Sequence, residues 1–168
     1  MSICEECLTP CDSYMTSNRS LWRKITAVLY SATILKFKAY CSRCRYKVLG
    51  DKNKIFLAKT AIVNNAFLNT NSGHITIEDW VFFGNNVSVI TGAHDYNLFD
   101  KERQTSCLQG RDIIIRHGAW IGANATILGP CEIGENSVVG AGSVVTRSVS
   151  SHTVVAGNPA RVIKKIGR

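Results

Sequence analysis

The sequence of 168 residues predicts an all-β fold, a parallel β-helix built from six-residue repeats with an α-helical segment in front of it. The first reason is an aliphatic residue at every sixth position, at Ile115, Ile121, Ile127, Ile133, Val139 and Val145. The second is a small or medium residue four positions after each of these, at Ala119, Ala125, Cys131, Ser137, Ser143 and Val149. A β-sandwich does not explain this regularity, because its turns fall at irregular intervals of roughly 8 to 12 residues.

The period has a simple physical meaning. Six residues make one short strand and one turn, so three repeats close a triangular coil. Stacked coils bury the aliphatic residues in a column, since each coil covers the one beneath it. The small residues fill the corners. Hexapeptide coils are known to be left-handed, an exception to the right-handed crossover rule, so we expect a left-handed parallel β-helix.

Residues 1–52 lack the repeat, and we expect one amphipathic helix within them, between Ser20 and about Tyr40. Apolar residues recur there at helical spacing, at Leu21, Ile25, Val28, Leu29, Ala32 and Leu35. This helix either packs on the β-helix or a neighbouring subunit, or makes a peripheral contact with an anionic membrane through its basic flanks. It does not span a bilayer, because the longest uncharged apolar stretch has eleven residues and a span needs roughly 20.

Residues 53–150 are expected to form the β-helix, and residues 151–168 a basic tail that packs on it. The same period continues in the sequence before these six repeats, with aliphatic positions at Ile75, Val81 and Val87. It is less clear still further upstream, at Ile55, Ala61 and Phe67. The stretch 92–112 has no period. Long loops in compact domains commonly carry function, so this stretch is the expected active-site loop.

The net charge of +8 is unevenly distributed. Residues 1–60 carry eleven Lys and Arg against four Asp and Glu, residues 61–160 are mildly acidic, and the last eight residues add four cations. The basic segment lacks the interleaved aromatic residues that stack on single-stranded nucleic acid. We therefore expect no nucleic-acid partner.

Seven cysteines, an odd number, and an N-terminus without a secretion signal indicate a reducing compartment, so we expect a cytoplasmic protein, with the inner face of the membrane as an alternative. Two Cys-x-x-Cys pairs, Cys4 with Cys7 and Cys41 with Cys44, have the spacing of a zinc site. Free thiols are the favoured interpretation, because Cys11 is left over and the second pair ends the predicted helix. Cys107 and Cys131 are not expected to be nucleophiles.

Four motifs stand out in the second half: Thr-Gly-Ala-His-Asp-Tyr at 91–96, Gly-Ala-Trp-Ile-Gly at 118–122, Gly-Ala-Gly-Ser-Val-Val-Thr at 140–146 and Ala-Gly-Asn-Pro-Ala-Arg-Val-Ile at 156–163. With these motifs, the run from about residue 61 to 165 resembles the hexapeptide-repeat sugar acetyltransferases. That group includes galactoside, maltose, nodulation-factor and exopolysaccharide (colanic-acid type) acetyltransferases. The resemblance implies an acetyl-CoA-dependent O-acetyltransferase that acts on a sugar or glycan hydroxyl.

The family's loop histidine is the general base, so the resemblance implies that role for His94. A hydroxyl that attacks a thioester must lose its proton, and neutral imidazole can accept it at physiological pH. For the acceptor, the resemblance points to Asn69 and Trp120. Asp95 either orients the imidazole or the acceptor, or caps a turn. Asn69 also has an alternative interpretation, as a residue that turns a corner.

For the acetyl-CoA, the resemblance points to the backbone at Gly122, Ala123 and Ala141, and to cations for its phosphates at Arg147, Arg161 and Lys164. It implies a homotrimer with active sites between subunits, and no metal in the site. Two alternatives stay open. One is N-acetylation of an amino sugar, and the other is a non-enzymatic scaffold bound to membrane through the basic N-terminus.

Overall fold

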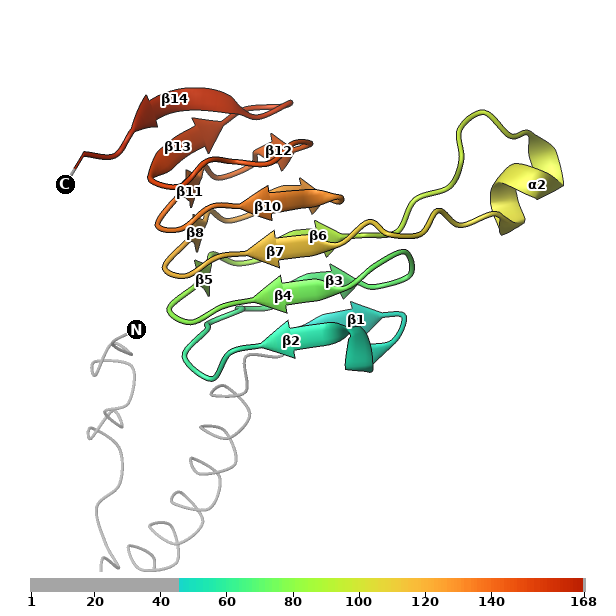
Figure 1. Cartoon of the computed structure of the whole chain (residues 1–168), viewed down its shortest axis with the longest axis horizontal. Coiled ribbons are helices and arrows are strands. Elements are labelled where there is room, and N and C mark those ends of the chain that lie inside the picture. Colours follow the sequence, from blue (N-terminus) through green and yellow to red (C-terminus); the bar gives the residue numbers. More distant parts are fainter. Residues whose placement is uncertain (1–45, 168) are drawn as a thin grey trace, which may run out of the picture. The chain divides into compact units, whose positions relative to one another are not determined.

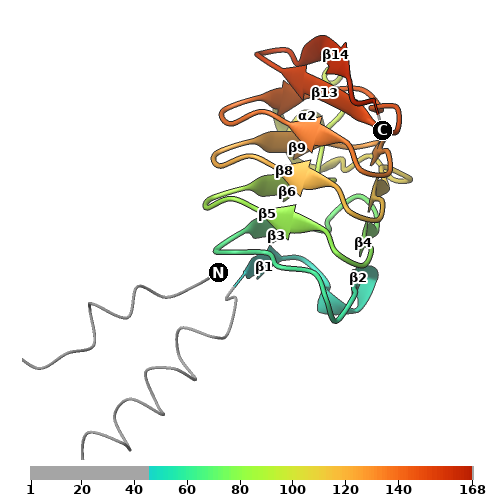
Figure 2. The same cartoon turned by 90° about the vertical axis from the view of Figure 1, so that its left-hand side faces the viewer.

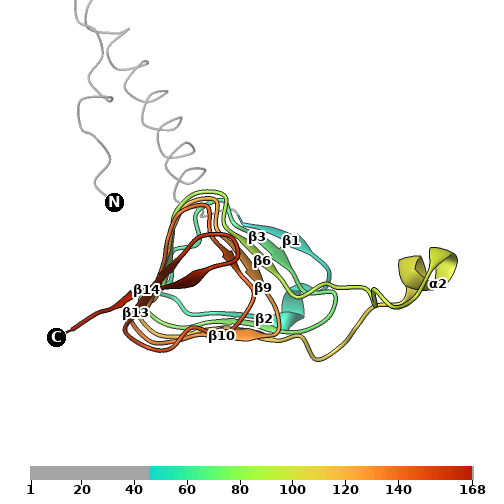
Figure 3. The same ribbon diagram turned by 90° about the horizontal axis from the view of Figure 1, so that it is seen from above.

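Short strands joined by tight turns wind residues 46–167 into a three-sided coil in this computed structural model (Figure 1). These are the residues that the structure describes, so the predicted amphipathic helix and the pairs Cys4–Cys7 and Cys41–Cys44 lie outside them. Seen from above, the coil is triangular, and one long excursion leaves it at a corner (Figure 3). Within residues 46–167, no helix has the length and apolar character needed to cross a bilayer.

One sheet lies on each side of the triangle, and strands of successive coils stack on one another (Figure 2). Sheet 1 contains β1 (Lys47–Leu49), β3 (Phe67–Asn69), β6 (Ser88–Ile90), β9 (Thr126–Leu128) and β12 (Val144–Val145). Sheet 2 contains β2 (Ile55–Leu57), β4 (Ile75–Ile77), β7 (Ile113–Ile115) and β10 (Cys131–Ile133). Sheet 3 contains β5 (Phe82–Phe83), β8 (Trp120–Ile121), β11 (Val138–Val139), β13 (Thr153–Ala156) and β14 (Arg161–Lys165). All these strand pairs are parallel except β13 with β14.

The chain runs from sheet 1 to sheet 2 to sheet 3 in each coil, and we name the turns between them corner 1–2, corner 2–3 and corner 3–1. A short 3-10 helix, η2 (Lys52–Lys54), lies in the first corner 1–2. The excursion also leaves from corner 1–2, between β6 and β7, and carries the helix α2 (Asp100–Thr105). We call residues 91–112 the arm.

The predicted aliphatic column forms the core. Ile115, Ile121, Ile127, Ile133 and Val139 are fully buried, and Val145 is 1% exposed. The predicted small residues of the same repeats are buried as well. Burial of one such aliphatic side chain contributes about 1.5–3 kcal/mol, so the column supplies a large part of the stability. The interpretation of this region as stacked parallel coils is confirmed.

The phase of the upstream repeats was predicted wrongly, although their period was right. Strand pairing aligns Ile77 with Ile115 and Phe83 with Ile121, two residues after the positions expected from Ile75 and Val81. Val81 precedes β5 as Ala119 precedes β8, and so fills a corner. In both of these repeats the expected residue and the residue two positions later are both apolar and buried, as Ile75 and Ile77 are. The six-residue period alone therefore does not determine which of the two continues the aliphatic column.

The two ends of the coil extend it beyond the regular repeats. β1 pairs in register with β3, so the coiled part already includes Lys47, ahead of the expected start at residue 53. At the other end, β13 continues sheet 3 and β14 folds back on it as an antiparallel edge strand. All five residues of β14 are exposed.

Candidate active site

A buried polar network holds the first residues of the arm against the coil below. Thr91 and Ser72 are both fully buried. The Thr91 hydroxyl donates to the Asn69 carbonyl at 2.8 Å, and the backbone N–H of Ser72 donates to that hydroxyl at 3.2 Å. The backbone N–H of Ala93 donates to the Ser72 hydroxyl at 3.2 Å. Buried hydroxyls that are satisfied in this way fix the direction in which the chain leaves the coil.

The Asn69 side chain lies directly beside the start of the arm. A Cβ atom at Gly92 would be 2.8 Å from Asn69 Oδ1, so a larger residue at position 92 would have to displace the Asn69 side chain. Asn69 Oδ1 also accepts from the backbone N–H of Asn71 at 3.0 Å, as in a turn. The side chain therefore has contacts that suit its corner-turning interpretation. It also lies against Gly92, which is two positions before His94 in the sequence.

His94 is exposed, and its imidazole is oriented by a backbone carbonyl. The two sides of the arm meet here, because His94 pairs with Cys107 in an antiparallel bridge and the N–H of Leu108 donates to the Ala93 carbonyl at 2.9 Å. His94 Nδ1 lies 2.8 Å from the Ser106 carbonyl oxygen. A carbonyl can only accept, so Nδ1 carries the proton and Nε2 of the neutral ring is left as an acceptor. This is the tautomer in which Nε2 can take a proton from a substrate.

Asp95 makes the contacts of a turn. Its Oδ1 accepts from the backbone N–H of Asn97 at 2.9 Å and from the side-chain amide of Asn97 at 3.0 Å. Of the two interpretations open from the sequence, these contacts match the capped turn.

Trp120 lies on β8 in sheet 3, whereas the arm leaves from corner 1–2, between sheets 1 and 2. Its side chain is 47% exposed and stacks on Phe82 in the coil below, with ring centroids 5.6 Å apart and an interplanar angle of 15°. Phe82 was not among the predicted site residues. With the correct phase of the upstream repeats, the sequence would have indicated Phe82, because that phase aligns Phe82 with Trp120 in the parallel pair of β5 and β8.

The predicted backbone positions for the cofactor lie together at corner 3–1. A Cβ at Gly122 would be 2.5 Å from the Ala141 nitrogen, so the coils touch backbone to backbone there. Ala123 is half-buried and Ala141 exposed, and neither side chain extends past Cβ. The corner therefore presents peptide groups to a slender ligand without long side chains in the way.

The three predicted cations do not form one cluster. Arg161 and Lys164 are exposed on β14, and Arg161 Nη1 donates to the Ala160 carbonyl at 2.9 Å. Arg147 follows β12 and precedes the Val149 bridge to Ile133, so it lies at corner 1–2. Within one chain, the structure brings Gly122, Ala123 and Ala141 together, but it leaves His94 and Arg147 at a different corner.

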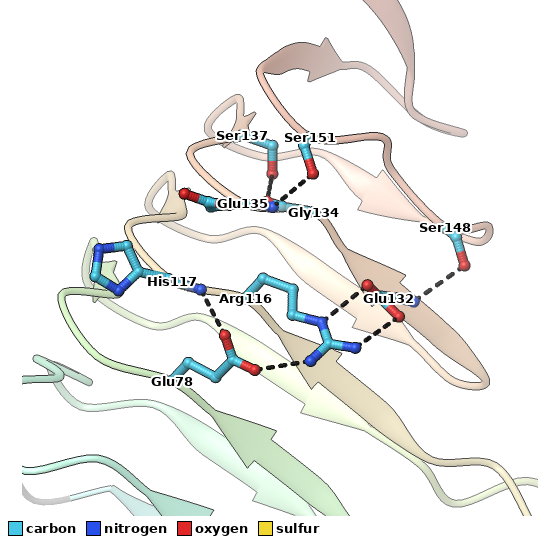
Figure 4. Close-up of polar contacts among 9 residues, drawn as sticks. All are labelled: Glu78, Arg116, His117, Glu132, Gly134, Glu135, Ser137, Ser148 and Ser151. Atoms are coloured by element: carbon cyan, nitrogen blue, oxygen red, sulfur yellow. Dashed lines mark hydrogen bonds and ion pairs between the residues drawn. The ribbon is translucent and has the colours of Figure 1, made fainter.

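Corner 2–3 carries an ion-pair cluster (Figure 4). Arg116 donates from Nη1 to Glu78 at 2.8 Å and from Nε to Glu132 at 2.9 Å, and the backbone N–H of His117 donates to Glu78 at 2.9 Å. The hydrogen bond from Arg116 lowers the pKa of the Glu132 carboxyl below its ordinary value. The cluster ties together three successive coils, and its role is structural.

The Cys131 thiol does not have the surroundings of a nucleophile. Burial raises the pKa of the Cys131 thiol to about 11, which disfavours the reactive thiolate. Cys107 is exposed on the arm. Between residues 46 and 167, no group of three or more His, Cys, Asp and Glu side chains is placed to hold a metal ion.

The repeats match a known family model. Residues 112–147 match the model described as bacterial transferase hexapeptide, six repeats. A Saccharomyces cerevisiae protein classed as an acetyltransferase is 34% identical over 115 residues, which cover 68% of this chain and 57% of that protein. Serine acetyltransferase 2 of Arabidopsis thaliana is 32% identical over 154 residues, which cover 80% of this chain and 46% of that protein. The chain spans about half the length of the curated relatives it matches.

Solved structures show the same coil. A hexapeptide-repeat acetyltransferase from Vibrio cholerae has a TM-score of 0.57 and 28% identity, and the match covers 73% of this chain and 72% of that one. A complex of that Vibrio cholerae protein with acetyl coenzyme A also matches, with a TM-score of 0.52, 26% identity and coverage of 92% and 94%. A maltose O-acetyltransferase from Clostridium difficile has a TM-score of 0.53 and 26% identity, over 91% of this chain and 80% of that one. These likenesses imply the left-handed winding that we expected from the known architecture of hexapeptide coils, and they support the hexapeptide-repeat acetyltransferase family for the coiled part of the chain.

Proposed function

We propose that this chain, whose coils match the hexapeptide-repeat acetyltransferases, is an acetyl-CoA-dependent O-acetyltransferase that acts on a sugar or glycan hydroxyl. The observation that carries the proposal is the imidazole of His94, exposed on the arm, with Nδ1 2.8 Å from the Ser106 carbonyl. A fixed tautomer with a free Nε2 is what a general base needs. His94 is the base in this proposal.

The reaction follows from that tautomer. The acceptor hydroxyl gives its proton to Nε2 of His94 while its oxygen forms a bond to the thioester carbonyl carbon. The C–S bond then breaks, and the thiolate that leaves takes the proton back from Nε2. No acyl-enzyme is needed, which agrees with the raised pKa of the Cys131 thiol.

The co-substrate fits corner 3–1. Acetyl-CoA ends in a slender pantetheine arm with amide groups, which can bond to exposed peptide groups where side chains are short. Gly122, Ala123 and Ala141 offer such a surface, because the coils are stacked there backbone to backbone. The cations of β14, Arg161 and Lys164, are suited to the phosphates. The acetyl-CoA complex of the Vibrio cholerae protein supports this use of the fold.

The proposed site is shared between two copies of the chain. His94 is on the arm at corner 1–2, whereas Trp120 and the backbone of corner 3–1 are on other sides of the triangle, and this separation supports a site built from two chains. A homotrimer in which the arm of one subunit faces corner 3–1 of the next resolves this separation. In that arrangement Asn69, Asp95 and Trp120 surround the acceptor, and Arg147 reaches the co-substrate from the neighbouring subunit.

The test is release of CoA thiol from acetyl-CoA in the presence of a panel of acceptors: monosaccharides, disaccharides, nucleotide sugars and amino sugars. We expect turnover with a sugar hydroxyl and a fall in kcat of about 100-fold or more in His94→Ala, because proton removal is lost. His117→Ala is the matched control, since His117 is an exposed histidine at corner 2–3, and it should keep wild-type kcat. Undiminished turnover in His94→Ala would refute the base, and products acetylated only on nitrogen would refute the acceptor class.

A further inference from the structure

Arg111, at the end of the arm, reaches back to its beginning. Nε of Arg111 donates to the Thr91 carbonyl at 3.0 Å, although the two residues are separated by the whole excursion. Nη2 of the same guanidinium donates to the carbonyl of Gly129, in the next coil. One planar side chain thus joins the two ends of the arm to each other and to the coil above.

The backbone of Arg111 completes the connection on the other side. Its N–H donates to the Ser72 carbonyl at 3.0 Å, in the coil below. Ser72 is also the residue whose hydroxyl accepts from the N–H of Ala93. Arg111 and Ser72 together hold the start and the end of the arm against two neighbouring coils.

The arm has little else to fix its position. Residues 94–110 include no fully buried residue, so apolar packing contributes little to the placement of the excursion. Exposed hydrogen bonds near the tip, such as that from Arg103 Nη2 to the Tyr96 carbonyl, link parts of the arm only to each other. The direction of the arm is therefore set at its foot, and His94 is three residues from Thr91.

We infer that Arg111 is a positioning residue for the His94 base, acting through the carbonyl of Thr91 at the foot of the arm. This inference rests on the proposed function. The guanidinium suits the task because its fork donates in two directions at once, to carbonyls that belong to different coils. A lysine at this position provides one compact ammonium in place of the rigid fork, so Arg111→Lys does not reproduce the connection.

The experiment compares Arg111→Lys and Arg111→Met with the wild-type chain in its native assembly. We expect kcat to fall about tenfold in each variant, with the KM for acetyl-CoA within about twofold of wild type, since a misplacement of about 1 Å costs rate while corner 3–1 is untouched. Hydrogen–deuterium exchange of the segment 91–95 should rise at least about tenfold, because the amides at the foot lose their protection. Arg116→Gln is the matched control, as it removes a partly exposed arginine from corner 2–3, and it should lower the melting temperature without changing kcat.

Three outcomes are decisive. Wild-type kcat in Arg111→Met overturns the inference, and so does unchanged exchange of residues 91–95. A loss of kcat that Arg116→Gln reproduces at the same loss of melting temperature also overturns it, because the effect is then one of general stability. If the wild-type chain transfers no acetyl group to any acceptor, the proposed function fails, whereas the exchange measurement still tests the connection made by Arg111.

Discussion

At the scale of single residues, the backbone determines the tautomer of His94 and the strain at Trp80. His94 owes its tautomer to the carbonyl of Ser106, a group that every residue type carries. Trp80 adopts a left-handed conformation, with φ of 62°, at corner 2–3. The same place in the next two coils is occupied by Gly118 and Asn136, residues that adopt this conformation easily. Trp80 is therefore strained, and its side chain is 64% exposed, so burial does not offset the cost.

This strain predicts that Trp80→Asn is stabilising. A left-handed conformation costs an ordinary residue roughly 1–2 kcal/mol, and asparagine avoids part of that, so we expect the free energy of unfolding to rise by up to about 1 kcal/mol. The backbone N–H of Trp80 donates to the Thr60 hydroxyl at 2.9 Å, and we expect the variant to keep this hydrogen bond because it does not involve the side chain of residue 80. Thermal unfolding measures the effect. Phe82→Asn is the control, since Phe82 is exposed on a strand and stacked on Trp120, and it should be destabilising. An equal loss in both variants would contradict the argument.

At the scale of elements, glycines bring the backbones of successive coils together at all three corners, as at Gly122, Gly129 and Gly134, and two of the corners add side-chain contacts. Corner 3–1 uses the close approach of Gly122 to the backbone of the next coil, and corner 1–2 uses the hydrogen bonds of Arg111. Corner 2–3 uses the ion pairs of Arg116 with Glu78 and Glu132 (Figure 4). The ion pairs at corner 2–3 depend on pH, because they need ionised carboxylates. The contacts named at the other two corners involve no carboxylate and do not depend on pH in this way.

Glu132→Gln is therefore expected to lower the melting temperature at pH 7 and to have no effect in acid. The pKa of Glu132 is lowered in the folded chain, so its contribution to stability is full above the ordinary glutamate pKa of about 4.3 and is lost as the pH falls through the lowered value. Melting curves of both proteins across this range check the prediction. Glu135→Gln is the control, since the Glu135 carboxylate accepts from Asn136 and has no ion pair among residues 46–167, and it should show no such difference. A deficit for Glu132→Gln that persists at low pH would contradict the ion-pair explanation.

At the scale of the whole molecule, the proposed site is divided between sides of the triangle. His94 projects with the arm from corner 1–2, and Ala141 is exposed at corner 3–1. The sheet 3 face beside that corner also carries exposed apolar side chains in register, Ile62, Phe82 and Trp120. A surface of this kind is suited to contact with another subunit.

Two inactive variants should therefore complement each other. His94→Ala and Ala141→Trp are each expected to be inactive, because one lacks the base and the other blocks corner 3–1. When both are co-expressed and assemble at random into trimers, about a quarter of the shared sites receive an intact arm and an intact corner. We expect about that fraction of wild-type activity, and light scattering should give three times the chain mass of 18.5 kDa. Recovery of no activity, or an active monomer, would show that the site lies within one chain.

The sequence by itself determined the repeat and the place where it is interrupted. Ile115 to Val145 predicted the buried column because one strand and one turn occupy six residues, whatever the surroundings. The loss of period at residues 92–112 likewise predicted the excursion that carries His94. Local spacing was sufficient in both cases, since the pattern and the structure share one period.

Only the tertiary structure decided which residues meet across coils. The upstream phase was ambiguous because Ile75 and Ile77 are both apolar, and pairing with β7 selected between them. Arg111 gave no signal in the sequence, since its partners are backbone carbonyls, that of Thr91 at the other end of the arm and that of Gly129 in the next coil. The resemblance implied a site between subunits, but only the structure places His94 and Trp120 on different sides of one chain. Contacts between residues of distant sequence depend on how the coils stack, and a one-dimensional pattern does not contain that information.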